Sequence, residues 1–295
     1  MQLDQLIDRA SGFFLPDTGD GVPILAGESG LGLIRYRKPT TFECTIYRPI
    51  MCLILQGSKE TVIGGASTRF GPGQSLIVSH DLPVVSRVTE AEADKPYYAL
   101  VSEIDLGIVR SLHDKIGVHG SDEGQVTAVN IGESGAALVD VLDRLLKTGE
   151  NPTEAEVLGP LLKQELHFRL LMAPHGVMLR NLLRRDSHAS RIGQAIERIR
   201  RDYQVPIKVN ELAGEAGMSV SSFHQHFKSV TATTPLQYQK ELRLVEARRL
   251  IVGGEKSVSG AAFEVGYESP TQFSREYSRK FGTAPSTDLE LAAQM

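Results

Sequence analysis

Residues 209–231 read VNELAGEAGMSVSSFHQHFKSVT, and residues 258–281 read VSGAAFEVGYESPTQFSREYSRKF. Each stretch begins with apolar residues at i, i+3, i+4 and i+7, which is the spacing of one buried helix face. A glycine follows, Gly217 or Gly266, where a residue with positive φ can end that helix. A serine then begins a second helix as its N-cap. Helix, glycine turn and capped second helix form a helix-turn-helix motif, and the chain contains this motif twice.

The second helix of each copy has an apolar inner face. Its members are Val220, Phe223, Phe227 and Val230 in the first copy, and Phe273 and Tyr277 in the second. Between the copies we expect a helix from Pro235 to about Val252, since proline is favoured at a first helical position and Gly253-Gly254 can end it. Its apolar residues spread over more than one face, which is typical of a rod that packs against a module at each end. We therefore predict an all-α domain in residues 191–295.

The outward faces of the two second helices are the predicted base-reading surfaces. They carry Ser221, Ser222, Gln225 and Lys228 in the first copy, and Thr271, Gln272, Ser274 and Arg275 in the second. Glutamine pairs with adenine and arginine with guanine, each giving about 1–3 kcal/mol of discrimination, so we expect Gln225 and Arg275 to carry most of the readout. The alternative for any single position is a solvated surface residue. The linking helix would hold the reading helices ~34 Å apart, one DNA turn.

This half of the chain resembles the DNA-binding domain of the AraC/XylS family of bacterial transcription regulators. The matching residues are Leu212-Ala213, Gly217-Met218-Ser219, Phe223, Phe227-Lys228, Pro235, Leu236, Tyr238, Arg243, Ala247-Arg248-Arg249-Leu250, Ala262, Gly266-Tyr267-Glu268-Ser269, Gln272-Phe273-Ser274-Arg275 and Phe281-Gly282. Two features depart from the family pattern. The usual glycine before the linking helix is replaced around Ala232-Thr233, and the Tyr-Arg pair expected after Pro285-Ser286 is absent.

Length and composition favour two ordinary globular domains. The chain has 295 residues, of which 41% are hydrophobic and 23% are charged. No apolar run approaches the roughly 18 residues of a membrane span, and residues 1–10 lack the pattern of a secretory signal. Two cysteines do not make a disulfide framework. We therefore expect a cytoplasmic protein without a membrane segment.

Charge divides the chain into two halves. Residues 1–185 contain 18 Lys and Arg against 23 Asp and Glu, whereas residues 191–281 contain 14 against 10. An acidic half joined to a basic half is expected when only one half meets phosphate. Because the basic excess is small, nonspecific DNA affinity should be moderate and depend strongly on salt.

The N-terminal half is predicted to be mainly β-structure followed by helices. Short segments rich in Val, Ile and Tyr, punctuated by Gly and Pro, are expected as strands at residues 31–37, 44–55, 60–63, 75–78, 84–88 and 97–104. They indicate a small antiparallel barrel or sandwich. From Asp105 the apolar period becomes helical, and residues from Ala137 to Leu166 predict a helical hairpin. The glycine-rich pieces at Gly64-Gly65 and residues 71–73 are expected as hairpin turns, and residues 117–124 as a loop.

This half resembles the N-terminal region of one AraC-type subgroup. The match lies in Tyr47-Arg48-Pro49, Leu55-Gln56-Gly57-Ser58-Lys59, Pro72-Gly73, Asp81-Leu82-Pro83 and Pro96-Tyr97. The resemblance implies a cupin-like domain that binds an effector and forms homodimers through its late helices. The expected fold is α+β: a cupin-like β-barrel plus helical hairpin in residues 1–177, a linker in 178–190, and the double helix-turn-helix domain in 191–295.

No arrangement of side chains in the N-terminal half predicts catalysis or a metal site. His80, His113 and His119 are isolated, and no close histidine pair with a following glutamate lies on a strand. Cys44 and Cys52 are eight residues apart, so on one uninterrupted strand they would share a face. A redox or electrophile sensor is one interpretation of that pair, but buried small hydrophobic residues are the simpler one.

Two groups of arginines are candidate effector ligands. Arg35, Arg37 and Arg69 are dense for an acidic half and favour an anionic ligand. Arg180 and Arg184 would lie one helical turn apart and could fork a phosphate or a guanine edge. This RxxxR pattern, with the SxxG sequence at residues 190–193, is similar to the arginine pair of cyclic-dinucleotide receptors. The alternative is a solvated linker that faces DNA.

We therefore predict a sequence-specific transcription regulator, not an enzyme, that binds double-stranded promoter DNA, responds to a small effector and forms a homodimer. No cofactor is expected, and RNA polymerase is an expected partner. Two alternatives remain: a constitutive DNA-binding dimer without a ligand, and a cupin-type enzyme with a DNA-binding tail. The sequence leaves open the effector, the operator, and whether the protein activates or represses.

Overall fold

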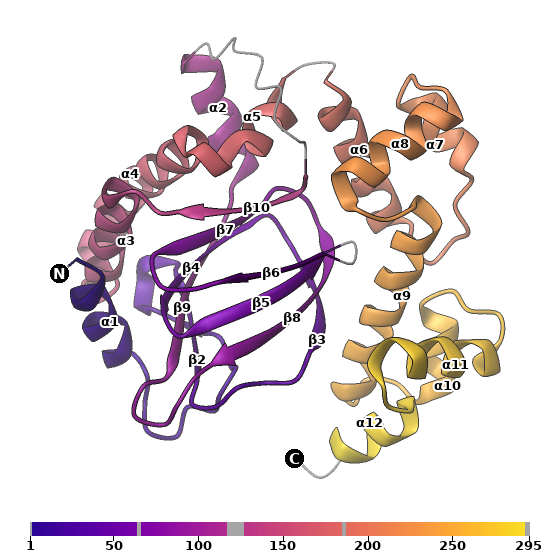
Figure 1. Cartoon of the computed structure of the whole chain (residues 1–295), viewed down its shortest axis with the longest axis horizontal. Helices are drawn as coiled ribbons and strands as arrows, with labels where there is room; N and C mark the ends of the chain where they lie inside the picture. The colour runs from indigo at the N-terminus through magenta and orange to yellow at the C-terminus, as the bar shows by residue number, and fades with distance from the viewer. Residues whose placement is uncertain (1, 64–65, 117–126, 185–186, 293–295) are drawn as a thin grey trace.

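The computed structural model describes residues 2–63, 66–116, 127–184 and 187–292 (Figure 1). A β-rich body occupies the centre, with one group of helices on its left and the C-terminal helices on its right. The predicted turn at Gly64-Gly65, the predicted loop at residues 117–124 and His119 lie outside the described residues.

Two antiparallel sheets form the β-rich body. The six-stranded sheet has the order β1-β2-β9-β4-β7-β10 and the four-stranded sheet the order β3-β8-β5-β6. In chain order the strands are β1 (Ile24–Leu25), β2 (Gly32–Tyr36), β3 (Glu43–Tyr47), β4 (Ile50–Gln56), β5 (Ser58–Ile63), β6 (Ala66–Phe70), β7 (Gln74–Val78), β8 (Leu82–Glu90), β9 (Tyr97–Glu103) and β10 (Val129–Glu133). The two-sheet body followed by helices confirms the predicted α+β class.

One predicted strand was wrong. Residues 44–55 do not form a single strand: β3 and β4 belong to different sheets, and Arg48-Pro49 separates them. Proline has no N–H to donate to a ladder, which explains the break at that point. Cys44 and Cys52 therefore do not share a strand; Cys44 is half-buried on β3 and Cys52 is buried on β4.

Helices cover one face of the large sheet. They are α1 (Gln2–Gly12), α2 (Leu106–Ile116), α3 (Ala136–Thr148) and α4 (Pro152–Met172). The pair α3 and α4 is the predicted hairpin. Asn151 begins α4 as an N-cap, because its side chain accepts hydrogen bonds from the backbone N–H groups of Thr153 and Glu154. Leucines from this pair pack in one core with Met51, Leu53 and Leu100 of the sheet.

Eight helices follow in the rest of the described chain. They are α5 (Val177–Leu183), α6 (His188–Arg201), α7 (Val209–Glu215), α8 (Val220–Thr231), α9 (Pro235–Val252), α10 (Val258–Glu264), α11 (Pro270–Phe281) and α12 (Pro285–Ala292). All of α5 except its first residue, and the first three residues of α6, lie within the segment 178–190 that was predicted as a linker. Ser187 is the N-cap of α6, since its hydroxyl accepts a hydrogen bond from the N–H of Ser190.

Two separate cores hold the C-terminal helices. The first module, α7 and α8, shares a core with the two-sheet body, which is called the barrel below for brevity: Phe223 and Phe227 belong to the same buried cluster as Leu82 and Tyr97. The second module, α10 and α11, packs instead on the far end of α9 in a cluster of its own, which includes Phe273. The long helix α9 runs between the two modules, as predicted (Figure 1).

Candidate nucleic-acid interface and effector regions

The caps and turns predicted for the two modules are present. Gly217 and Gly266 have φ of 62° and 88°. Ser219 accepts a hydrogen bond from the N–H of Ser222, and Ser269 accepts one from the N–H of Gln272. Two features exclude a side chain at position 266. One is the positive φ, and the other is that a Cβ would lie 2.0 Å from the carbonyl oxygen of Gln204. Helices α8 and α11 are thus fixed at their N-terminal ends.

Burial fixes which face of α8 is outward. Phe223 and Phe227 are fully buried, so Ser221, Gln225 and Lys228 are exposed, with Ser222 partly exposed. Among the residues described, Gln225 has no hydrogen-bond partner within the chain and its amide is free to meet a base. Val220, expected on the inner face, is 46% exposed because it is the first residue of the helix and lies beyond the packed turn.

The outward face of α11 has a comparable arrangement. Thr271, Gln272 and Arg275 are exposed, whereas Phe273 is fully buried. Arg275 has no ion pair in the described part of the chain. The other two polar groups are partly engaged. The Gln272 amide donates to Glu276 at 3.3 Å, and the Ser274 hydroxyl donates to the carbonyl of Pro270 at 2.9 Å.

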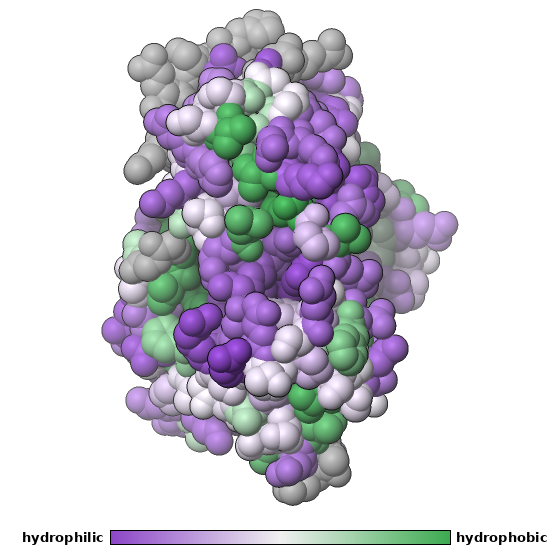
Figure 2. All heavy atoms as spheres, turned by 90° about the vertical axis from the view of Figure 1, so that its right-hand side faces the viewer, coloured by the Kyte–Doolittle hydropathy of each residue, from purple (hydrophilic) through white to green (hydrophobic). Residues whose placement is uncertain are grey.

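Two residues near these faces were given no role from the sequence. Arg279 is exposed one turn beyond Arg275, and the i+4 spacing on the predicted helix would have found it. His226 on α8 stacks on His188 of α6, with ring centroids 3.9 Å apart. No sequence signal links positions 188 and 226, because their contact is tertiary. The side of the molecule that carries both modules is mainly hydrophilic (Figure 2).

Asp81, between β7 and β8, joins the barrel to the C-terminal helices. Its backbone carbonyl accepts a hydrogen bond from the Tyr238 hydroxyl of α9 at 2.5 Å, and its carboxylate pairs with Arg200 of α6 at 3.1 Å. A third contact runs from the N–H of Ala128 to the carbonyl of Val230 at 2.9 Å. Burial raises the pKa of Asp81, against the opposing charges of Arg200 and Arg48.

The barrel contains a half-buried lysine without a carboxylate partner among the described residues. The Lys59 ammonium donates to the Tyr47 hydroxyl at 2.7 Å, and that hydroxyl lies 3.3 Å from the hydroxyl of Ser86. Burial would lower the pKa of Lys59, but the neighbouring Tyr47 and Cys52 raise it above its ordinary value. The Thr61 hydroxyl, on the strand beside Ser86, is buried with no hydrogen-bond partner.

The arginines proposed as effector ligands do not meet in one pocket. Arg35 and Arg37 both donate to the carbonyl of Thr18, at 2.7 and 2.9 Å, and Arg35 lies over the ring of Phe14. Arg69 is exposed and pairs with Glu90. Arg180 is on α5 and donates to the carbonyls of residues 171 and 173, whereas Arg184 lies just past that helix and is exposed.

Within the described ranges, no group of three or more His, Cys, Asp or Glu side chains is placed to hold a metal ion. Among the helices of those ranges, none is long and apolar enough to cross a membrane.

Two sequence profiles match the chain. Residues 28–178 match the AraC-type transcriptional regulator N-terminus, and residues 212–290 match a helix-turn-helix domain. The first match alone covers just over half of the chain. The protein belongs to the AraC-type family of transcriptional regulators. The family resemblance inferred from the sequence is thereby confirmed.

AraC-type regulators from several bacteria are similar to this chain. The HTH-type transcriptional regulator ExsA of Pseudomonas aeruginosa is 30% identical over 132 residues, which cover 44% of this chain and 46% of ExsA. The thermoregulatory protein LcrF of Yersinia pestis is 27% identical over 178 residues, or 60% of this chain and 64% of LcrF. The matches thus span about half to two thirds of these relatives' lengths.

The whole architecture is shared with ToxT of Vibrio cholerae. A crystal structure of ToxT with a bound unsaturated fatty acid superposes with a TM-score of 0.55 and covers 92% of this chain and 96% of ToxT. The identity is 14%, so the likeness concerns the fold.

Proposed function

We propose that the protein is a sequence-specific DNA-binding transcription regulator that reads two successive major grooves with α8 and α11. The observation that carries this proposal is the repeated, serine-capped helix with a buried aromatic face and an exposed polar face. Gln225 and Arg275 supply base-edge hydrogen bonds, and Lys228 and Arg279 supply phosphate contacts. A protein that reads promoter DNA in this way acts in the cytoplasm of a bacterium.

The test is binding to DNA fragments selected from the host genome by the wild-type chain. We expect affinity to fall steeply as salt rises, because phosphate contacts release counterions. The double variant Gln225→Ala/Arg275→Ala should lose selective binding. The matched double variant Arg201→Ala/Gln204→Ala, exposed at the last residue of α6 and in the turn after it, should keep selective binding. Unchanged selectivity in the first double variant would refute the assigned reading faces.

We also propose that the barrel binds a small anionic effector at Lys59. A half-buried ammonium is stabilised by an opposite charge, and within the described chain only neutral groups approach that of Lys59. This location replaces the arginine groups, since Arg35, Arg37 and Arg180 are already held by carbonyl groups. Native mass spectrometry of protein purified from its host should show a retained acid, absent from Lys59→Met but present in Lys38→Met, an exposed control. A fully unliganded wild-type protein would favour a constitutive regulator.

A homodimer through α4 is the third part of the proposal. The outer face of this helix exposes Val157, Leu158 and Leu161, three apolar residues within little more than one turn. A second copy of the chain would cover this stripe. Leu161→Glu should give a monomer in light scattering, whereas Leu25→Glu, an exposed apolar residue on β1, should not. RNA polymerase as a partner stays a prediction.

A further inference from the structure

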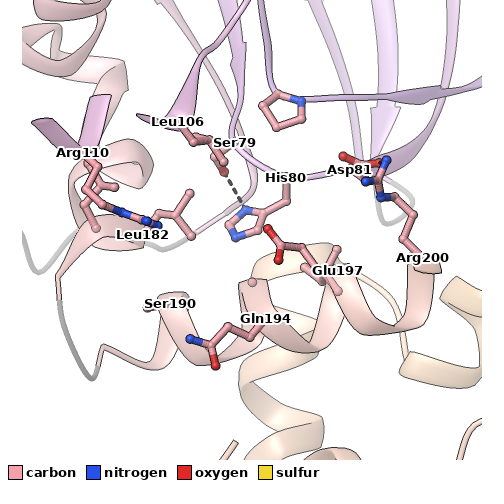
Figure 3. Close-up of a pocket in the computed structure, with 14 residues that line it drawn as sticks. Ser79, His80, Asp81, Leu106, Arg110, Leu182, Ser190, Gln194, Glu197 and Arg200 are labelled. Carbon is pink, nitrogen blue, oxygen red and sulfur yellow. Dashed lines mark hydrogen bonds and ion pairs between the residues drawn. The ribbon is translucent and has the colours of Figure 1, made fainter. Parts of the chain in front are cut away.

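A cavity of about 240 Å³ lies where the barrel, the connecting helix α5 and helix α6 of the DNA-binding half meet (Figure 3). Its walls come from both halves of the chain. The barrel side contributes Ser79, His80 and Arg110, and the other side contributes Leu182, Gly193 and Glu197. None of the functional roles assigned above uses this cavity.

His80 presents an unused hydrogen-bonding atom to the cavity. The residue is 5% exposed, and its Nδ1 lies 2.9 Å from the hydroxyl of Ser79. That hydroxyl also donates to the carbonyl of Ala128 at 3.3 Å, so it accepts from Nδ1–H, and Nε2 is left as an acceptor. Nε2 is buried without a partner. Burial lowers the pKa of His80 to about 4, so the ring is neutral near pH 7.

Gly193 keeps the space in front of this nitrogen open. A Cβ at position 193 would lie 2.7 Å from Nε2 of His80 and 3.0 Å from a methyl group of Leu182. The glycine is in the middle of α6, where it weakens the helix by about 1 kcal/mol relative to alanine. Its position is therefore explained by the close approach of the imidazole and not by helix formation.

Opposite charges face the cavity from its two sides. Arg110 of α2 lies on one side of His80 and Glu197 of α6 on the other (Figure 3). Neither has an ion-pair partner among the residues that the structure describes. The other two charged groups of the wall, Asp81 and Arg200, neutralise each other at 3.1 Å. The wall also has an apolar part, which includes Leu106 and Leu182.

We propose that this cavity binds a small aliphatic amino acid as a zwitterion. Its ammonium would donate to Nε2 of His80 and to the Glu197 carboxylate, and its carboxylate would accept from Arg110. An amine alone would leave Arg110 without a partner, and a carboxylic acid alone would leave Nε2 and Glu197 without a donor. The cavity volume admits a side chain of a few carbons against Leu106 and Leu182.

Such a ligand would hold the DNA-binding half against the barrel. It would bind only when α6 lies beside residues 79–80, so it would stabilise the docked arrangement by a free energy that grows with the logarithm of its concentration over its dissociation constant. This regulatory consequence rests on the proposed function as a DNA-binding regulator, but the binding site itself does not.

Calorimetric titration of the full chain with the proteinogenic L-amino acids tests the proposal. We expect at least one aliphatic member to bind. The corresponding amine without the carboxylate, and the corresponding acid without the ammonium, should each bind about tenfold or more weakly, since each loses a charge-assisted hydrogen bond. Equal binding of the amine or the acid would overturn the zwitterion assignment, and no binding by any amino acid would overturn the site.

Substitutions of the cavity residues test whether the amino acid binds in this cavity. Arg110→Met and Glu197→Gln, both at exposed positions, should weaken binding about tenfold or more. Lys115→Met, on the same helix as Arg110 but outside the cavity, should bind as the wild type does. Gly193→Ala should abolish binding, because the methyl group would cover Nε2 of His80. Unchanged affinity in Arg110→Met and Glu197→Gln would place the ligand elsewhere and overturn the proposal.

DNA binding, measured on the same preparations, separates the two proposals. A chain that binds selected DNA but no amino acid would refute the cavity assignment and leave the regulator proposal intact. A chain that binds an amino acid but no DNA would refute the regulator proposal and leave the cavity assignment intact. Under the proposal, Gly193→Ala should bind DNA with an affinity that the amino acid no longer changes.

Discussion

The two helix-turn-helix modules follow one sequence pattern but have different structural surroundings. The first module is docked: Phe223 lies in a core that continues into the barrel, and Tyr238, next to that module on α9, donates to Asp81. The second module is anchored to α9 and α12 through a core of its own. A signal that begins in the barrel therefore reaches the first module through a shared core, whereas it reaches the second through α9 and through the side-chain contact of Lys280 on α11 with Cys44 on β3.

The largest expected difference concerns the two buried phenylalanines. Phe223→Ala and Phe273→Ala should each lower the free energy of unfolding of their own module by about 3–5 kcal/mol, because each leaves a cavity in a closed core. Hydrogen exchange should show α10 and α11 opening in Phe273→Ala, with α8 protected. In Phe223→Ala, loss of protection should extend to the barrel. If the loss of protection extended into the barrel in both variants, the two cores would not be separate.

Acid should affect the docked module first. The pKa of His80 is lowered from 6.5 to about 4, so below pH 6.5 the unfolded state takes up a proton that the folded state excludes. The free energy of unfolding should therefore fall by about 1.4 kcal/mol per pH unit between pH 6.5 and 4, and be unaffected by His80 above that range.

Urea denaturation at a series of pH values measures this slope. The His80→Gln variant should lose the part of the pH slope that His80 contributes. The His224→Gln variant, changed on α8 away from the contact between His80 and α6, should keep that part. The second module has no histidine, so its local opening should not depend on pH through this group. A slope that is the same in the wild type and in His80→Gln would show that His80 titrates normally.

The reading faces should differ in specificity and not in stability. Gln225→Ala should relax selection at one adenine and Arg275→Ala at one guanine, each by about 1–3 kcal/mol, since each removes one bidentate contact. Binding to randomised DNA followed by sequencing gives both values. Loss of selection at the same base pair in both variants would contradict two modules in successive grooves.

The smallest expected effect concerns the C-caps of the two reading helices. Ala232 ends α8 with φ 59°, whereas Gly282 ends α11 with φ 72°. Ala232→Gly should raise stability by about 0.5–1 kcal/mol by relieving the left-handed conformation, and Gly282→Ala should lower it by about 1 kcal/mol. Thermal denaturation measures both. A destabilised Ala232→Gly would show that unfolded-chain entropy outweighs the relieved strain.

Local features were largely predictable because they depend on neighbours in sequence. The serine caps, the two positive-φ glycines and the buried aromatic pairs were all expected from spacing alone. The strand prediction failed at Arg48-Pro49, where a local apolar run concealed a change of sheet. Strands β6 and β10 were missed: β6 is mostly exposed and β10 is an edge strand, so neither has a strong apolar pattern.

The sequence by itself determined that this chain has two DNA-reading modules joined by a helix, because helix periodicity, capping and turn glycines act over a few residues. Only the tertiary structure decided that Asp81 contacts Tyr238 and Arg200, that His80 lies against Gly193, and that Lys59 donates to Tyr47. These contacts join residues far apart in sequence, and they follow from how two cores pack together, which no local pattern encodes.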